Sequence, residues 1–219
     1  AIDNIKNKKF NITDISSKIV SRNPSGPFTT STLQQVASSR LGFGASRTMQ
    51  IAQKLYQGIE IEGDTVGLIT YMRTDGTNLS ADAVTDFRNF IKKQYGNEYL
   101  PENPNNYSGK KAKNAQEAHE AIRPTDINRN PETIKKYLSS DQQKLYSLIW
   151  SRALSSQMET AKFDRNTITI ESEDGKTICK SSGSVLKFDG FLKVYSNQSK
   201  DDDEQILPQM SKGPINIEA

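Results

Sequence analysis

Three side chains within one short stretch could together perform chemistry on a phosphate. Tyr71, Arg73 and Asp75 alternate within the run TYMRTD at positions 70–75, so an extended backbone would project all three from one face. A deprotonated phenol is a nucleophile, a guanidinium stabilises a phenolate and grips a phosphate, and a carboxylate can hold the guanidinium in place. The alternative is a structural tyrosine beside an Arg–Asp ion pair, and residue types alone favour that alternative.

A second stretch with the same potential is QEAHEAIRPTD at positions 116–126. On a helix, His119 and Arg123 are four residues apart and share a face, and Pro124 would end that helix. A histidine beside an arginine suits contact with phosphate, and histidine also titrates near neutral pH. The alternative is a surface histidine next to a Glu120–Arg123 pair. This alternative is favoured on residue types alone, because isolated surface ion pairs are common and seldom indicate a function.

The elements that must position these residues are mostly helical. The cluster NPSGP at positions 23–27 breaks an extended first segment. Helical spacing of apolar residues then predicts helices that begin after a Thr/Ser run, at Ser46, after Ser80, at Asn130-Pro131 and at a Ser140–Gln143 capping box. Glycines 42 and 58 are expected to end the first two helices, and Tyr56 is expected to point inward.

Beyond position 160 the period changes to that of strands. Short β-rich runs are expected at 167–170, 177–179, 185–188 and 191–195, with Asp174-Gly175 and Asp189-Gly190 as hairpin turns. The sequence therefore predicts an α+β chain in which a mostly helical domain is inserted into an antiparallel β domain. We expect residues 1–27 and 159–219 to form the β domain and residues 28–158 the helical domain.

Composition limits the classes of protein that remain. The formal net charge is +3, which is low for a chain that holds nucleic acid by charge alone. Mean hydropathy is −0.70, and the chain has neither a long apolar run nor the pattern of a secretory signal. The single Cys179 cannot form an internal disulfide, and one Cys with one His cannot complete a structural zinc site. A reducing, cytoplasmic setting fits these features.

Motifs in a fixed order carry a resemblance to a known family. PFTTSTLQQ at 27–35, RLGF at 40–43, TYMRTD at 70–75 and QEAHEAIRP at 116–124 closely resemble bacterial DNA topoisomerase I of the type IA family. The resemblance continues through QQKLY, LIW and LKFDGF and covers essentially the whole chain. Methionine at position 72 makes the motif resemble that of topoisomerase I, since topoisomerase III usually has proline there.

The resemblance implies a role for each matching residue. Tyr71 attacks the DNA backbone and becomes linked to the 5′ phosphate, and Arg73 contacts the scissile phosphate. His119 lies near the phosphates of the bound single strand. The remaining residues support these three or contact DNA: Gln53, Thr70, Asp75, which orients Arg73, and Arg123, which supports His119. Gly76 and Gln57 depart from the family pattern, which commonly has Ser and Glu at these positions.

The resemblance also implies partners and a cofactor outside this chain. In the family, an acidic Toprim domain that binds Mg²⁺ precedes this region, and a further DNA-binding segment follows it. The chain has no acidic cluster on a strand, and DDDE at 201–204 is a contiguous polar run. We therefore expect no metal site in this chain, and expect the chain alone to be nearly inactive. The resemblance implies that the whole enzyme is a bacterial, nucleoid-associated monomer with no membrane partner. Its expected substrate is a single-stranded segment of negatively supercoiled DNA.

Two readings from other classes stay open at this point. One is a catalytically silent module that binds single-stranded DNA and retains the motif surface. The other is a regulatory fragment that binds protein rather than DNA. Formation of a covalent link through Tyr71 separates either of them from a topoisomerase fragment.

Overall fold

The chain forms two compact units, which we describe separately. The computed structural model describes residues 8–107, 120–195 and 211–215. The β unit comprises residues 1–22, 161–189 and 197–219, and the helical unit comprises residues 23–160 and 190–196. His119 and the acidic run at 201–204 lie outside the described residues.

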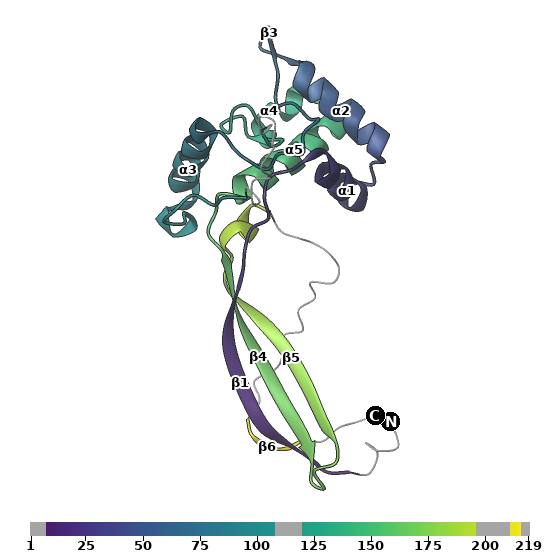
Figure 1. Cartoon of the computed structure of the whole chain (residues 1–219), viewed down its shortest axis with the longest axis vertical. Coiled ribbons are helices and arrows are strands. Elements are labelled where there is room, and N and C mark those ends of the chain that lie inside the picture. The colour runs from purple at the N-terminus through teal and green to yellow at the C-terminus, as the bar shows by residue number, and fades with distance from the viewer. Residues whose placement is uncertain (1–7, 108–119, 196–210, 216–219) are drawn as a thin grey trace, which may run out of the picture. The chain divides into compact units, whose positions relative to one another are not determined.

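The β unit is an antiparallel sheet with the strand order β5-β4-β1-β6. Its strands are β1 (Phe10–Arg22), β4 (Ala161–Ser172), β5 (Ile178–Phe188) and β6 (Gly213–Ile215). In Figure 1, β1, β4 and β5 run side by side as one long ribbon. The predicted turn at Asp174-Gly175 is confirmed, because it joins β4 to β5 with Gly175 at a φ of +67°, a backbone conformation that favours glycine.

Long strands replace the shorter ones expected from the sequence, since β4 extends well beyond 167–170 and β5 joins the runs expected at 177–179 and 185–188. β1 pairs with β4 from Phe10 opposite Ser172 to Arg22 opposite Ala161. The register shifts once, between Ile12 and Asp14. Polar residues continue the strands beyond each β-rich run, since backbone pairing along the ladder does not require an apolar side chain at every position.

The helical unit consists of short helices with a two-stranded hairpin. Its elements are α1 (Thr30–Leu41), α2 (Ala45–Gln57), β2 (Ile59–Ile61), β3 (Asp64–Val66), α3 (Ala81–Tyr95), α4 (Pro131–Ile134) and α5 (Ser140–Ser155), with 3-10 turns η2 (Asn97–Tyr99), η3 (Lys135–Tyr137) and η4 (Gly190–Lys193). A mostly helical unit beside an antiparallel sheet is the α+β architecture predicted from the sequence. In the described part of the chain, no helix is long and apolar enough to cross a membrane.

Capping residues explain where these helices begin and end. Thr29 and Thr32 form a capping box at the start of α1, and Gly42 ends that helix at a φ of +68°. The Ser80 side chain accepts a hydrogen bond from the Ala83 amide and caps α3. These starts and stops agree with the sequence prediction, since a hydroxyl supplies the acceptor that the first turn lacks.

The capping box of α5 lies one residue earlier than predicted. Ser139 accepts from the Gln142 amide, and the Gln142 side chain accepts from the Ser139 amide. Ser140 and Gln143 have the same spacing but are already helical. The predicted Ser140–Gln143 capping box is therefore wrong by one position.

α5 forms the centre of the helical unit. Leu145 and Ile149 are fully buried on it, and the Trp150 indole donates to the Ile127 carbonyl at 2.9 Å. The Tyr146 hydroxyl donates to the Arg129 carbonyl at 2.8 Å, and burial raises the pKa of that phenol. The polar atoms that α5 buries are thus paired, as a close-packed interior requires.

Residues 190–196 belong to the helical unit rather than to a last strand of the β domain. Phe191 and Tyr195, four residues apart, are both buried, and the Phe191 amide donates to the Glu159 carbonyl at 2.9 Å. Gly190 has a φ of +49°, and a Cβ there would meet two backbone carbonyls at 2.6 Å. The expected strand at 191–195 is therefore wrong, because Gly190 turns the chain into η4.

Candidate active site

The TYMRTD segment alternates between buried and exposed side chains, as predicted, without forming a strand. Met72 and Thr74 are buried, whereas Tyr71, Arg73 and Asp75 are exposed. Tyr71 is 47% exposed as a whole residue. Ile69 forms only an isolated bridge with Pro124.

The first turn of α1 holds this segment in place. The Thr30 hydroxyl donates to the carbonyls of Met72 at 2.8 Å and Thr74 at 3.0 Å. The same hydroxyl accepts from the Thr74 amide at 2.8 Å, and the Thr30 amide donates to the Thr74 carbonyl at 2.8 Å. The PFTTST and TYMRTD motifs are therefore joined by hydrogen bonds on both sides of Arg73.

The end of the third motif is extended and lies against the same segment. Glu120, Ile122 and Pro124 form isolated bridges to Asn78, Phe28 and Ile69 respectively. The predicted helix does not include these residues, because buried Ala121 and Ile122 donate their amides to other segments and Pro124 disfavours a helical residue before it. His119 itself is outside the described residues.

Thr70 ties the nucleophile segment to the third motif. Its hydroxyl donates to the Ala121 carbonyl at 2.7 Å and accepts from the Arg123 amide at 3.0 Å. Its amide donates to the Arg123 carbonyl at 2.9 Å. The Thr70 hydroxyl is thus bonded to the backbone of the third motif, and this structural role explains why a hydroxyl residue stands at position 70.

Arg123 is paired within the protein. It forms a bidentate ion pair with Glu120, with nitrogen–oxygen distances of 2.6 and 3.0 Å, and also donates to the Pro124 carbonyl at 2.9 Å. Burial raises the pKa of Glu120, but hydrogen bonds from Arg123 and Ser80 outweigh it and leave the pKa below its ordinary value. The Glu120–Arg123 pair is the alternative that the sequence left open.

Arg73 differs from Arg123 in having no ion pair or hydrogen bond with the described residues. The expected pair with Asp75 is not formed, although both side chains are exposed. Asp75 therefore does not orient Arg73 in this structure. Arg73 also lines an open hollow of about 510 Å³ with the hydroxyl residues Thr29, Thr30 and Ser31.

Tyr56 is a neighbour of Tyr71 that sequence reasoning missed. Its ring meets the Tyr71 ring edge to face, with centroids 5.4 Å apart and planes at 67°. Tyr56 is 43% exposed, so the expectation that it points inward is wrong. Gln53, which the resemblance implied as a residue that supports the site or contacts DNA, lies one helical turn earlier on α2 and is exposed.

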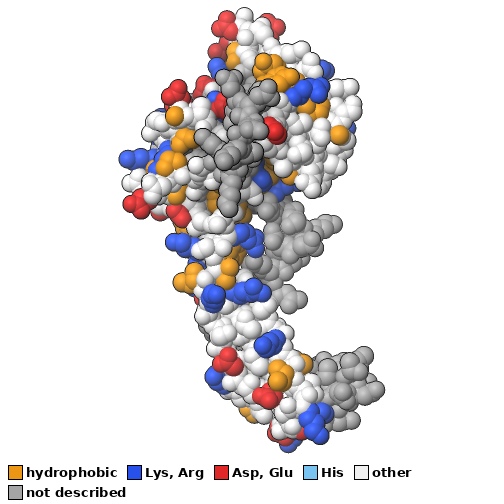
Figure 2. Space-filling model, in the orientation of Figure 1, with side chains coloured by type: hydrophobic (Ala, Val, Ile, Leu, Met, Phe, Trp, Pro, Cys, Tyr) orange, Lys and Arg blue, Asp and Glu red, His pale blue; other side chains and the backbone are white. Residues whose placement is uncertain are grey.

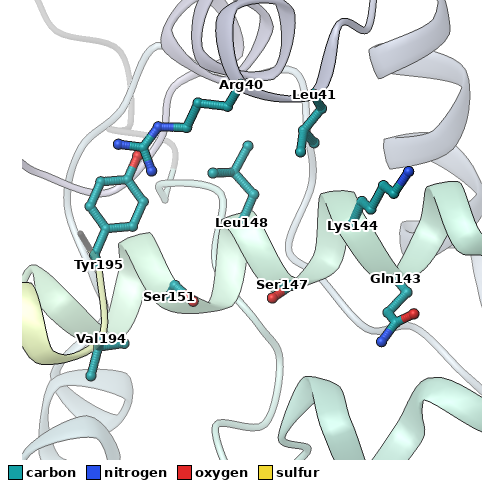
Figure 3. A pocket seen from close by; sticks show the side chains of 9 residues that line it. All are labelled: Arg40, Leu41, Gln143, Lys144, Ser147, Leu148, Ser151, Val194 and Tyr195. Carbon is teal, nitrogen blue, oxygen red and sulfur yellow. The ribbon is translucent and has the colours of Figure 1, made fainter. Parts of the chain in front are cut away.

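A second hollow, of about 460 Å³, lies elsewhere in the helical unit. Figure 3 shows it between the end of α1, one face of α5 and the segment Val194-Tyr195. The Arg40 guanidinium stacks 4.4 Å from the centre of the Tyr195 ring. None of the predicted site residues lines this hollow. Among the described residues, no group of three or more His, Cys, Asp or Glu could hold a metal ion.

Comparison with known proteins identifies the family to which this chain belongs. Residues 1–218 match the family model described as DNA topoisomerase. The chain is 51% identical over 201 residues to DNA topoisomerase 1 of Rickettsia typhi, covering 92% of this chain and 26% of that protein. It is 46% identical to DNA topoisomerase 1 of Xylella fastidiosa strain 9a5c, covering 97% and 27%.

A solved structure agrees with the sequence comparison. Full-length topoisomerase I from Thermotoga maritima superposes with a TM-score of 0.82 at 36% identity, covering 98% of this chain and 34% of that one. The chain thus spans about a quarter of the length of the curated relatives described here. On its motifs, its fold and these matches, the chain belongs to the bacterial type IA DNA topoisomerase family.

Proposed function

We propose that this chain is the part of an ATP-independent DNA topoisomerase that supplies the nucleophile. The Tyr71 oxygen attacks a backbone phosphorus, the bond to the 3′ oxygen breaks, and the protein is left linked to the 5′ phosphate. The freed 3′ hydroxyl later attacks the phosphotyrosine and restores the strand after another strand has passed, which relaxes negative supercoils. The observation that supports this most is an exposed Tyr71 where hydrogen bonds join three motifs.

Arg73 is proposed to bind the phosphate that Tyr71 attacks. Two residues apart on a segment with alternating burial, the two side chains reach solvent on the same side. A guanidinium without a partner among the described residues can follow charge from the phenolate to the phosphate oxygens as the new bond forms. His119 is proposed to contact phosphates of the bound strand. Thr70 and Arg123 act as positioning residues, since both are bonded within the protein.

The remaining chemistry is proposed to come from the rest of the polypeptide. The described residues hold no acidic cluster that fits Mg²⁺, so we assign the metal to other domains and derive no step through it. The proton for the leaving 3′ oxygen would also come from a group outside this chain. The substrate is a single-stranded segment of negatively supercoiled DNA, and the whole enzyme is proposed to act as a cytoplasmic monomer at the bacterial nucleoid.

A chimaera tests the proposal. Residues 1–218 would replace the matching segment of the Rickettsia typhi protein, and the product would be incubated with Mg²⁺ and negatively supercoiled DNA. We expect relaxation and a covalent 5′-phosphotyrosine adduct, both abolished by Tyr71→Phe. The matched control is Tyr137→Phe, which makes the same chemical change at an exposed hydrogen bond to Glu62. Equal adduct from the chimaera with Tyr71→Phe would refute the nucleophile assignment, whereas DNA binding without any adduct would favour the silent binding module.

A further inference from the structure

One face of the β unit gathers cations that the sheet itself does not neutralise. In the register of the sheet, Lys18 lies directly opposite Arg165, and Arg165 lies directly opposite Ser184. The next row on that face is Ser16, Thr167 and Ser182, and the row after it includes Lys180 opposite Thr169. We call this set of side chains the cationic face: Ser16, Lys18, Arg165, Thr167, Lys180, Ser182 and Ser184.

The juxtaposition of Lys18 and Arg165 is unfavourable for the fold. Like charges directly opposite each other on neighbouring strands destabilise a sheet. Lys18, Arg165 and Lys180 are exposed, and none forms an ion pair with residues of 8–107, 120–195 or 211–215. The sheet thus keeps a repulsive pair that any neutral or acidic residue in either place would remove.

Asp164 and Asp14 of the same sheet are engaged elsewhere, whereas Glu171 lies on the face of Arg165, six residues along β4. Asp164 precedes Arg165 and projects from the opposite face, where it accepts from Ser17 and pairs with Lys187 at 3.7 Å. Asp14 shares the cationic face but lies four residues from Lys18, about 13 Å along an extended strand. It pairs with Lys212 at 3.4 Å.

We propose that the cationic face binds the sugar–phosphate backbone of DNA, in addition to the contacts proposed for Tyr71 and Arg73. Lys18 and Arg165, which have no ion pair among the described residues, lie on neighbouring strands about 4.8 Å apart, so each can meet a phosphate oxygen. The surrounding serine and threonine hydroxyls add neutral donors of the kind that contact phosphates. Figure 2 shows Lys and Arg side chains at intervals along the visible face of the β strands. Because the proposed contacts are to phosphate, we expect binding to be independent of sequence.

This inference concerns binding alone and does not depend on the chemistry of Tyr71. The test therefore uses the whole chain with Tyr71→Phe, which separates its failure from that of the proposed reaction. The double variant Lys18→Gln with Arg165→Gln removes the facing cations. The matched control is Lys187→Gln, which removes a lysine from the opposite face of the same sheet. The probes are a DNA single strand and a duplex of one sequence, and poly-glutamate.

The readout is the affinity of each chain for DNA over a series of salt concentrations. We expect the double variant to weaken binding to at least one DNA probe and to lower the slope of log affinity against log salt by about one for each cation removed. The control should keep the parent's slope. Equal slopes for all three chains would overturn the proposal. Poly-glutamate that binds as tightly as DNA, and loses affinity equally in the double variant, would assign the face to an acidic protein segment and overturn it as well.

A second measurement distinguishes a binding surface from a structural one. Lys18→Glu replaces the repulsive pair with opposite charges across the same two strands. We expect its melting temperature to be equal to or higher than that of the parent chain, while its DNA affinity falls. A variant that melts earlier and binds DNA as the parent does would show that Lys18 serves the fold, against the proposal.

Discussion

The reactive side chain and the side chains that hold it make opposite kinds of contact. The Tyr71 hydroxyl has no hydrogen-bond partner among the described residues, and its ring is nearly half exposed. The Thr30 hydroxyl, in contrast, contacts the backbone on both sides of Arg73. Tyr71 is therefore open to a ligand, as proposed for a nucleophile, while Thr30 fixes the backbone beside it.

Thr30→Val should loosen the attachment of residues 70–75 to α1. The substitution keeps the shape of the side chain but leaves the Thr74 amide and the Met72 carbonyl without their partner, at a cost of about 1–3 kcal/mol. The Thr74 carbonyl keeps its hydrogen bond from the Thr30 amide. Urea unfolding measures this loss. Ser31→Ala is the control, because the Ser31 hydroxyl contacts only the exposed Thr29 hydroxyl, and it should change the free energy of unfolding by less than about 0.5 kcal/mol. Equal losses in both variants would contradict the assignment.

Glu120 should make the stability of the helical unit depend on pH. Its pKa in the folded chain lies below its ordinary value. A lowered folded pKa contributes stability that is fully present above the unfolded value of about 4.3 and is lost as pH falls through the folded pKa. Glu120→Gln should therefore be less stable than the parent at neutral pH, with a smaller difference in acid. Thermal melts across pH measure it, and a difference that grows in acid would contradict the pairing.

At the scale of elements, local sequence signals predicted where helices end, but they did not predict which segments pair with one another in the folded chain. Hydroxyl caps and glycines placed α1, α2 and α3 within one residue of the prediction. The extended form of Glu120–Pro124 was missed because its backbone partners, on Phe28, Thr70 and Asn78, are far away in the sequence. A turn at Asp189-Gly190 was predicted, but the 3-10 conformation of η4 was missed, because β-rich residues follow Gly190 and a hydrogen bond to distant Glu159 helps to select η4.

The position of the α5 cap can be tested directly, since two adjacent serines offer the same motif. Ser139→Ala should destabilise the chain by about 1 kcal/mol, because it removes the acceptor for the Gln142 amide. Ser140→Ala should have little effect, since alanine is a better helix former than serine at a position inside the helix. Chemical denaturation of the two variants measures the difference. A larger loss for Ser140→Ala would restore the capping box one residue later.

At the scale of the whole molecule, the β unit is assembled from segments on both sides of the helical unit. β1 lies between β4 and β6 in the sheet. It therefore adds a third strand to the β4–β5 hairpin and joins β6 to the sheet. Proximity in sequence explains only the β4–β5 hairpin. The division of the chain could be anticipated from the change of period near residue 160, but the position of β6 beside β1 could not, because three residues carry almost no pattern.

Deleting residues 1–22 should destabilise the β unit and leave the helical unit folded. β4 and β5 would remain as a two-stranded hairpin, which is at best marginally stable in water. We expect amides of β4 to lose protection from hydrogen exchange, while amides of α5 in the helical unit stay protected. Mass spectrometry of exchanged peptides distinguishes the two regions. Loss of protection in α5 as well would show that the helical unit requires β1 to fold.

The pairing of Arg22 with Ala161 also has a mechanical meaning. The chain enters and leaves the unit that carries Tyr71 through two adjacent strands whose ends meet at this pair. A pull on that unit is therefore divided between two covalent backbones that are hydrogen-bonded along most of their length. Such a pair of bonded strands resists stretching along its length far more than it resists bending.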